Sequence, residues 1–452
     1  MANAILQQVE ALRDLTESQV IPHLQATVVF VNLADRDFED WDKAMNDGTH
    51  GQFYRFLTPS YGRPQNQLGV AFSTLDSTQN QAFVAVDTPI SDGFVLSDEQ
   101  LATFPKKSIY DNFAKGKLIG LASKIDKVVR DQLQGTGFRW FANGNKTIPD
   151  ETNTSFPLLT ESLAEWDTFG EALSDVTNVV IPKRIAPKII ASMQNQFVPV
   201  RNDQIRKPGE IGMINGLQGF NFYSTNIIGK FNVGTVALKA PKAVISSIVN
   251  STTPFNATSQ FSSDATTIVL TGLTDGDIVK KGDLGDIGSA GGVADGQDAL
   301  ELIRPSDGDN TGIDGQFIVV DGGEVGAGGG NPAGEVSIQI FPRITATTGT
   351  NLDATVSRAV VTGASGDKVQ FVSRNHYKAP IFYTKFVKFA NPRLGTKSPF
   401  ATYSHPLTER MKMTVRMYHG SQLEGSQTGT IMDCFVGCRT IPIGVGHILF
   451  AA

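Results

Sequence analysis

The sequence predicts an α+β protein with a separate β-rich segment inserted in its second half. Two observations favour this class: helical periodicity runs through residues 108–134, and beyond residue 235 short apolar runs alternate with Gly, Asp and Thr. From about residue 350 the mixed pattern returns, as if the β-rich segment interrupted another domain. Because 452 residues exceed the usual ~150 per domain, we expect two to three domains.

The composition indicates a globular chain. Hydrophobic residues make up 40% and charged residues 19%. The 45 Gly and 21 Pro residues together are about 15% of the chain, below the ~25–30% typical of disordered chains. The formal net charge of −6 argues against a protein whose main task is to hold phosphates with basic side chains, although it is compatible with contact to a nucleic acid.

The cysteines and the N-terminal residues bear on the cellular compartment. Cys434 and Cys438 are too few for a disulfide framework, and a strand would hold them apart at their i, i+4 spacing, so we expect both to be reduced. The first basic residue, Arg13, follows an amphipathic start, and no run approaches the ~18 apolar residues of a membrane span. We therefore expect a soluble protein of intracellular origin.

The first hundred residues predict a projecting hairpin. Residues 4–30 begin with helical spacing of apolar side chains and end in a strand-like run at 26–31. Two further strand-like runs, 53–57 and 81–86, enclose a polar, turn-rich segment at 58–67. Such a hairpin buries little of itself within its own chain, so we expect its tip to contact a partner.

The strongest helical pattern lies at residues 108–134 and predicts a helix of about 40 Å. Gly116 and Gly120 lie one turn apart, which predicts close packing against another backbone. The predicted apolar stripe is Leu118, Leu121, Ile125, Val128 and Val129, and the lysines around it are Lys115, Lys117, Lys124 and Lys127.

Further elements follow along the chain, and the β-rich segment predicts a small barrel or sandwich. A helix is expected at 160–173, a strand at 176–181, and then a helix with Pro187 in its first turn. Strands are expected at 266–270, 317–320 and 336–341, a loop at 326–330, and a β-rich ending at 413–450.

Residues 236–345 are strongly acidic. These residues include 14 acidic and 6 basic side chains and so carry a net charge of −8. The rest of the chain therefore has a net charge of +2. A solvated surface explains such an excess most simply.

The residues that carry chemistry in enzymes show no convincing pattern. The six histidines are scattered, without metal-ligand spacing. Residues 328–333 fit a relaxed dinucleotide pattern, but a strand is expected after them where a helix N-terminus would have to hold the pyrophosphate. Residues 307–312 resemble the opening of a calcium loop, yet its twelfth position is Ile318 and no helix is expected beside it. We therefore expect no enzyme activity, no catalytic residues, no cofactor and no metal.

Three stretches, in order, resemble the major capsid (coat) proteins of tailed bacteriophages. The first is residues 83–86 with 92–101, followed by the long helix; the second is residues 209–211 with Gly219-Phe220 and Tyr223-Ser224; the third is residues 266–285. They are most similar to the short-tailed-phage subgroup, whose Hong Kong 97-type fold carries an inserted telokin-like β domain. The order of these stretches is a stronger signal than any one motif, because each motif specifies backbone shape rather than chemistry.

The resemblance implies a division of the chain into seven segments. These are an N-terminal arm (residues 1–45), an extended hairpin loop (46–90), a peripheral domain with the spine helix (91–205), a first axial part (206–235), the inserted β-barrel or sandwich (236–345), a second axial part (346–405) and C-terminal strands returning to the peripheral domain (406–452).

The resemblance also implies function and partners. The chain would self-assemble into hexamers and pentamers that form an icosahedral virion capsid, built in the host cytoplasm with a scaffolding protein and a portal protein. It would enclose double-stranded DNA by weak, non-specific contact and would involve no membrane. The competing hypothesis, a β-rich surface adhesin or carbohydrate-binding protein, explains residues 236–345 but not the long helix. The expected assembly contacts are Tyr61, Arg63, Gln65 and Asn66 in the hairpin tip and Asp307, Asp309 and Asp314 in the insertion.

Overall fold

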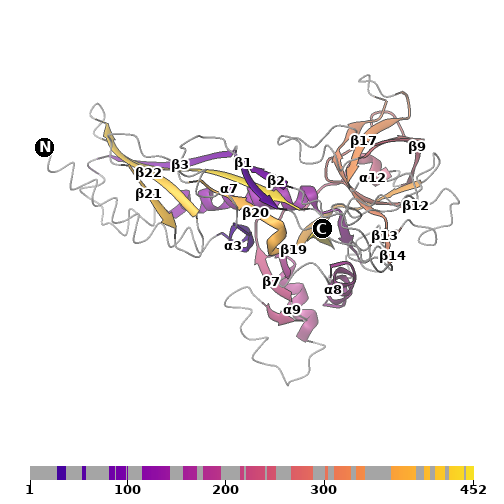
Figure 1. Cartoon of the computed structure of the whole chain (residues 1–452), viewed down its shortest axis with the longest axis horizontal. Coiled ribbons are helices and arrows are strands. Elements are labelled where there is room, and N and C mark those ends of the chain that lie inside the picture. Colours follow the sequence, from indigo (N-terminus) through magenta and orange to yellow (C-terminus); the bar gives the residue numbers. More distant parts are fainter. Residues whose placement is uncertain are drawn as a thin grey trace, which may run out of the picture. The chain divides into compact units, whose positions relative to one another are not determined.

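The computed structural model of the chain, whose helices and strands are labelled in Figure 1, divides by its internal contacts into two compact units. Unit 1 comprises residues 1–56, 83–132 and 387–439, and unit 2 comprises residues 57–82, 133–386 and 440–452. The structure describes residues 28–36, 53–57, 81–86, 88–97, 99, 115–142, 156–170, 177–194, 214–217, 220–239, 242–250, 266–288, 301–303, 310–326, 332–341, 368–392, 402–407, 413–422, 427–441 and 444–452.

Unit 1 combines one long helix with a five-stranded sheet. Helix α7 (Lys115–Thr136) confirms the helix predicted at 108–134 from residue 115 onward, and residues 108–114 lie outside the described ranges. Its residues Leu121, Ile125 and Val129 are buried as the periodicity predicted. In the sheet, β23 pairs antiparallel with both β22 and β3. The strands of the sheet are β3 (Thr88–Ser97), β20 (Val387–Ala390), β21 (Thr402–Leu407), β22 (Met413–Gln422) and β23 (Gln427–Thr440).

The base of the predicted hairpin also belongs largely to unit 1. Strands β1 (Phe53–Leu57) and β2 (Gln81–Ala85) confirm the two predicted runs and form a two-stranded sheet. Tyr54, Phe56 and Val84 are buried, so the base of the hairpin is packed into a core. The tip, at residues 58–67, lies outside the described residues.

Unit 2 contains a seven-stranded sheet in the order β4-β24-β19-β5-β7-β6, with β8 also paired to β19. Strand β19 (His376–Tyr383) lies between β24 and β5, and all eight of its residues are buried. The other strands are β4 (Arg139–Phe141), β5 (Thr177–Pro182), β6 (Ile214–Leu217), β7 (Phe220–Thr225), β8 (Lys230–Phe231) and β24 (Val445–Ala451). The helices of this part are α8 (Phe156–Gly170), α9 (Ala186–Gln194) and α12 (Thr235–Lys239).

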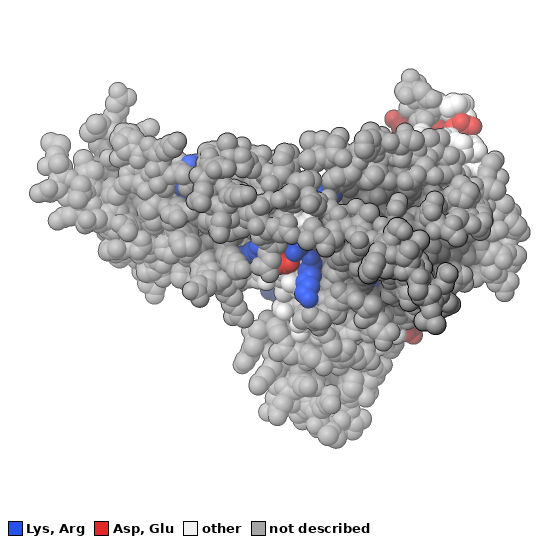
Figure 2. Space-filling view, viewed as in Figure 1, with Lys and Arg blue, Asp and Glu red and all other residues white. Residues whose placement is uncertain are grey.

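The predicted β-rich segment forms a closed six-stranded barrel in the order β10-β17-β15-β12-β18-β9. Strand β17 (Val336–Phe341) shows why the pattern was visible in the sequence: Val336, Ile338 and Ile340 are buried while Ser337 and Gln339 are exposed. The acidic side chains at the top right of Figure 2 lie over this barrel. The other barrel strands are β9 (Lys242–Asn250), β10 (Thr266–Thr271), β12 (Leu284–Gly288), β15 (Gln316–Asp321) and β18 (Lys368–Phe371).

The limits of the barrel differ from the predicted segment 236–345. Strand β18 pairs with β9 on one side and β12 on the other, so the barrel closes only with residues 368–371. The pairing is non-local, and the four residues Lys-Val-Gln-Phe give too short a pattern to reveal it. Two small ribbons, β11 (Ile278–Val279) with β16 (Gly323–Glu324) and β13 (Glu301–Ile303) with β14 (Asn310–Asp314), accompany the barrel strands.

Two local predictions were wrong. The strand expected at 26–31 is not formed by its last residues, because Phe30 and Val31 begin the short helix α3 (Phe30–Leu33). The close packing expected at Gly116 and Gly120 is also absent among the described residues. A Cβ on Gly116 would meet nothing within 4 Å, and one on Gly120 would meet only the Asp92 carboxylate at 3.7 Å.

Candidate functional site

The predicted assembly contacts are placed only in part by the structure. Asp314 ends β14, at the register position opposite Glu301 of β13. The remaining predicted contacts lie outside the described residues, and the role of all seven stays a prediction. These residues are Tyr61, Arg63, Gln65, Asn66, Asp307 and Asp309.

One face of the β3–β23 ladder presents an apolar pair that the sequence analysis missed. Val95 is 58% exposed and Ile431 is 52% exposed, although both belong to regular strands. The register sets Val95 opposite Gly429 and Gly93 opposite Ile431, so the two large side chains lie diagonally on one face with a glycine beside each. Val95 and Ile431 together form a small exposed apolar patch on the ladder.

The opposite face of the same ladder is covered. Ile90, Phe94, Met432 and Cys434 are buried, and their alternation with the exposed residues follows the two-residue period of a strand. Asp92 belongs to this covered face, and its carboxylate lies 3.6 Å from the Lys117 amine of α7. The helix therefore packs on one side of the ladder and leaves the Val95 side open within the described part of unit 1.

An ion pair stabilises the open face beside Ile431. Arg416 of β22 lies opposite Asp433 of β23, and its guanidinium donates to both carboxylate oxygens, at 2.9 and 2.5 Å. Both side chains are partly buried. A bidentate arginine–carboxylate pair has a fixed geometry, so it holds the two strands in register next to the apolar pair.

Asp126 anchors the segment before the hairpin to the long helix. Its carboxylate is buried in α7 and accepts hydrogen bonds from the backbone N–H of Val29 (2.7 Å) and of Val31 (3.0 Å). Burial raises the pKa of Asp126 to about 6, against the opposing effect of these backbone donors. A negative charge at the first turn of α3 also suits the orphan N–H groups there.

A second set of contacts holds the other end of this segment to β20. Asp35 accepts from the amine of Lys388, and backbone hydrogen bonds join Asp35 to Val387 and Phe389. The guanidinium of Arg36 lies over the Phe389 ring at 5.4 Å and donates to the carbonyl of Val31. Burial lowers the pKa of Arg36 to about 10. Residues 28–36 are thus tied at both ends within unit 1.

Unit 2 contains a group of buried ionisable side chains on one face of its sheet. His376 and Lys378 alternate along β19, and His447 of β24 shares their face because it lies opposite Pro380. The Lys378 amine donates to the carbonyl of Gly282 and lies 3.8 Å from the centroid of the Phe231 ring.

Burial decides the protonation of this group. It lowers the pKa of Lys378 and raises the pKa of Asp283, which accepts from the backbone N–H of Gly234 and of Lys280. Burial lowers the pKa of His376 to about 3 and holds the pKa of His447 well below its ordinary value. The positive charge of the nearby Lys378 lowers both pKa values further. Both imidazoles are therefore neutral at physiological pH.

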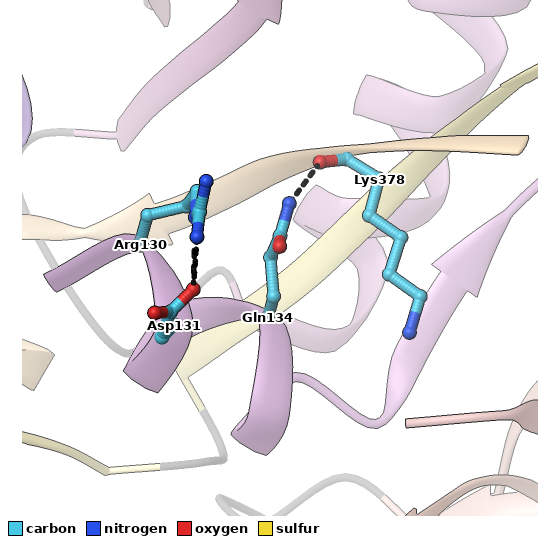
Figure 3. A network of polar contacts seen from close by, with 4 residues as sticks. All are labelled: Arg130, Asp131, Gln134 and Lys378. Atoms are coloured by element: carbon cyan, nitrogen blue, oxygen red, sulfur yellow. Dashed lines mark hydrogen bonds and ion pairs between the residues drawn. The ribbon is translucent and has the colours of Figure 1, made fainter. Parts of the chain in front are cut away.

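The barrel is joined to the sheet by direct contacts. The side-chain amide of Gln316 in β15 hydrogen-bonds the backbone of Trp140 in β4, and the Trp140 indole N–H donates to the carbonyl of Gly285 at 3.1 Å. Phe138 and Phe341 pack edge to face at 5.5 Å. Figure 3 shows Gln134, from the last turn of α7, directed at the carbonyl of Lys378, to which it donates at 3.3 Å.

The side chains of His376, Lys378 and His447 are fully buried, and both cysteines are buried as well. Cys434 and Cys438 are free thiols, as expected, and burial raises the pKa of Cys434 to about 12, so its thiolate is absent at neutral pH. No group of three or more His, Cys, Asp or Glu side chains within the described ranges is arranged to hold a metal ion. Among the described helices, none combines the length and the apolar character needed to cross a membrane.

Comparisons with known proteins gave matches among solved structures alone. No family model matches the chain, and no curated protein is similar to it. The chain is similar to the capsid of the cyanophage P-SCSP1u, with a TM-score of 0.42 and 9% identity over 94% of this chain and 88% of that one. It is similar to the capsid of Ralstonia phage GP4 (TM-score 0.40, 9% identity, 93% and 87% covered) and to a chain of Mycobacterium phage Che8 (0.40, 10%, 93% and 90%).

Proposed function

We propose that this chain is the major capsid protein of a tailed phage, which assembles into hexamers and pentamers and closes an icosahedral shell around double-stranded DNA. The order of the described elements carries the proposal. The β1–β2 base leads to β3 and then to the long helix α7, a barrel interrupts the sheet of unit 2, and the last strands return to pair with β3 and β19. This is the order that the sequence resemblance implies for the subgroup with an inserted telokin-like domain.

The open face of the β3–β23 ladder supports the same function. Strands of 10 and 14 residues expose Val95 and Ile431 side by side. In a subunit of a closed shell, neighbouring copies cover such apolar surface, whereas a monomer would leave it in water. The hairpin tip with Tyr61 and Arg63 is a second contact in this proposal, and the acidic insertion stands on the outer face.

The partners follow from the assembly. We assign the shell to the virion capsid, with assembly in the host cytoplasm on a scaffolding protein and around a portal protein. The chain is a structural protein in this proposal, and its buried ionisable groups hold the fold together.

Sedimentation of the purified full-length chain tests the proposal. With scaffolding protein present, the wild type should sediment as capsomers or shells, and Val95→Asp with Ile431→Asp should sediment as a folded monomer. Ile278→Asp, which alters an exposed apolar residue of the barrel ribbon, is the matched control and should assemble. A wild-type chain that stays monomeric at high concentration with scaffolding protein would refute the function.

A further inference from the structure

The solvent-facing side of α7 carries a row of lysines. Lys117, Lys124 and Lys127 are exposed, and at 3.6 residues per turn they fall within an arc of about 80°, away from the buried stripe of the helix. At 1.5 Å per residue the row extends about 15 Å along the axis. We call Lys117, Lys124 and Lys127 the lysine stripe.

The charge of the lysine stripe is largely unneutralised. Lys124 and Lys127 make no hydrogen bond or ion pair with any residue that the structure describes, whereas Lys117 forms a partly exposed ion pair with Asp92 at 3.6 Å. Asp131, the acidic residue beside the stripe, accepts from the guanidinium of Arg130 at 2.5 Å, as Figure 3 shows. The remaining acid of the helix, Asp126, is turned inward to α3.

The backbone beside the stripe is accessible. A Cβ at Gly116 would meet nothing within 4 Å among the described residues, and at Gly120 only the Asp92 carboxylate comes within that distance. These glycines were expected to receive another protein backbone. Their open surroundings instead leave room for a polyanion to approach the lysines closely.

We propose that the lysine stripe is where this subunit contacts the phosphate backbone of the enclosed double-stranded DNA; the inference rests on the proposed function. A row of charges along a straight helix suits a rod-like polyanion, whereas a small anion would need converging donors. Lysine is a point charge without base-reading geometry, so the contact is independent of sequence. The chain as a whole has a formal net charge of −6, so attraction confined to one stripe would position the DNA without strong adhesion elsewhere on the subunit.

Salt dependence of DNA binding tests the stripe. The purified full-length chain is titrated with a short double-stranded DNA of mixed sequence at several salt concentrations, by fluorescence anisotropy. Each lysine–phosphate contact adds about 0.9 to the slope of log K against log salt, so Lys117→Gln with Lys124→Gln and Lys127→Gln should lower the slope by about 2–3. The triple Lys→Arg variant keeps the charges and should retain the wild-type slope.

A matched control removes the same charge elsewhere. Lys183 and Arg184, in the turn before α9, and Lys188, in its first turn, are exposed in unit 2. Their triple Gln variant should have a slope that differs from the wild-type slope by less than about 0.5. The proposal would be overturned if both Gln triples lowered the slope equally, or if the stripe variant kept the wild-type slope. It would also be overturned if polyglutamate displaced the labelled DNA as effectively as unlabelled DNA does. Sedimentation of the same variants measures assembly separately. We expect the stripe variant to assemble normally. A wild-type chain that failed to assemble would refute the shell function, and the binding slopes would be unaffected.

Discussion

Gln316 completes the hydrogen bonds of Trp140 by mimicking a neighbouring strand. Its Oε1 accepts from the Trp140 N–H at 2.9 Å and its Nε2 donates to the Trp140 C=O at 2.5 Å. Trp140 lies in β4 at the edge of the sheet, and Gln316 lies in β15 of the barrel. One buried amide thus satisfies a sheet edge and fastens the barrel to the sheet.

We predict that Gln316→Leu destabilises unit 2 by about 2–4 kcal/mol, because it leaves a buried N–H and a buried C=O without partners. Gln134→Leu removes a single, longer contact to Lys378 and should cost less than about 1 kcal/mol. Urea unfolding followed by tryptophan fluorescence measures both. Equal midpoints for Gln316→Leu and the wild type would show that the amide pairing contributes nothing.

Acid should destabilise unit 2 through His376. Its folded pKa of about 3 lies below the ~6.5 of an unfolded histidine, so its contribution is complete above pH 6.5 and is lost as the pH falls toward 3. By pH 4.5 the loss should reach about 2–3 kcal/mol. His376→Gln removes this titration, and thermal melts at pH 7.5 and 4.5 should show a smaller shift than for the wild type. Identical shifts would contradict the burial of a neutral imidazole.

Asp126 should show the opposite pH dependence in unit 1. Its folded pKa of about 6 lies above the ~3.9 of an unfolded aspartate, so its contribution to stability is full at low pH and is lost as the pH rises through 6. The stability of the wild type relative to Asp126→Asn should rise by about 2 kcal/mol from pH 8 to pH 4. Asp131→Asn, an exposed change on the same helix, is the control and should track the wild type. A pH-independent difference for Asp126→Asn would count against the buried carboxylate.

The barrel should need β18 to fold in isolation. A fragment of residues 236–372 contains all six strands, whereas 236–345 leaves the partner edges of β9 and β12 open. We expect the longer fragment to give dispersed amide resonances and a cooperative melt, and the shorter one to aggregate or remain unfolded. A well-folded 236–345 fragment would show that closure by β18 is dispensable.

Local patterns in the sequence predicted elements but not the contacts between them. The alternation in 336–341 and the stripe of α7 were visible because burial follows the period of each element. Asp126 was missed although it falls on the buried arc of its helix, since its partners are backbone groups 95–97 residues away. His376 and Lys378 left a faint signal, two polar residues at alternate positions of an otherwise apolar strand. The pairing of Gln316 with Trp140 left none, because 176 residues separate them.

Electron microscopy of the assembled protein shows whether the chain builds a closed icosahedral shell. The purified chain, expressed with its scaffolding protein, should form closed particles of uniform diameter whose images average with icosahedral symmetry, and the Val95→Asp, Ile431→Asp variant should yield none. Fields containing only monomers or irregular aggregates of the folded wild-type chain would contradict assembly into a shell.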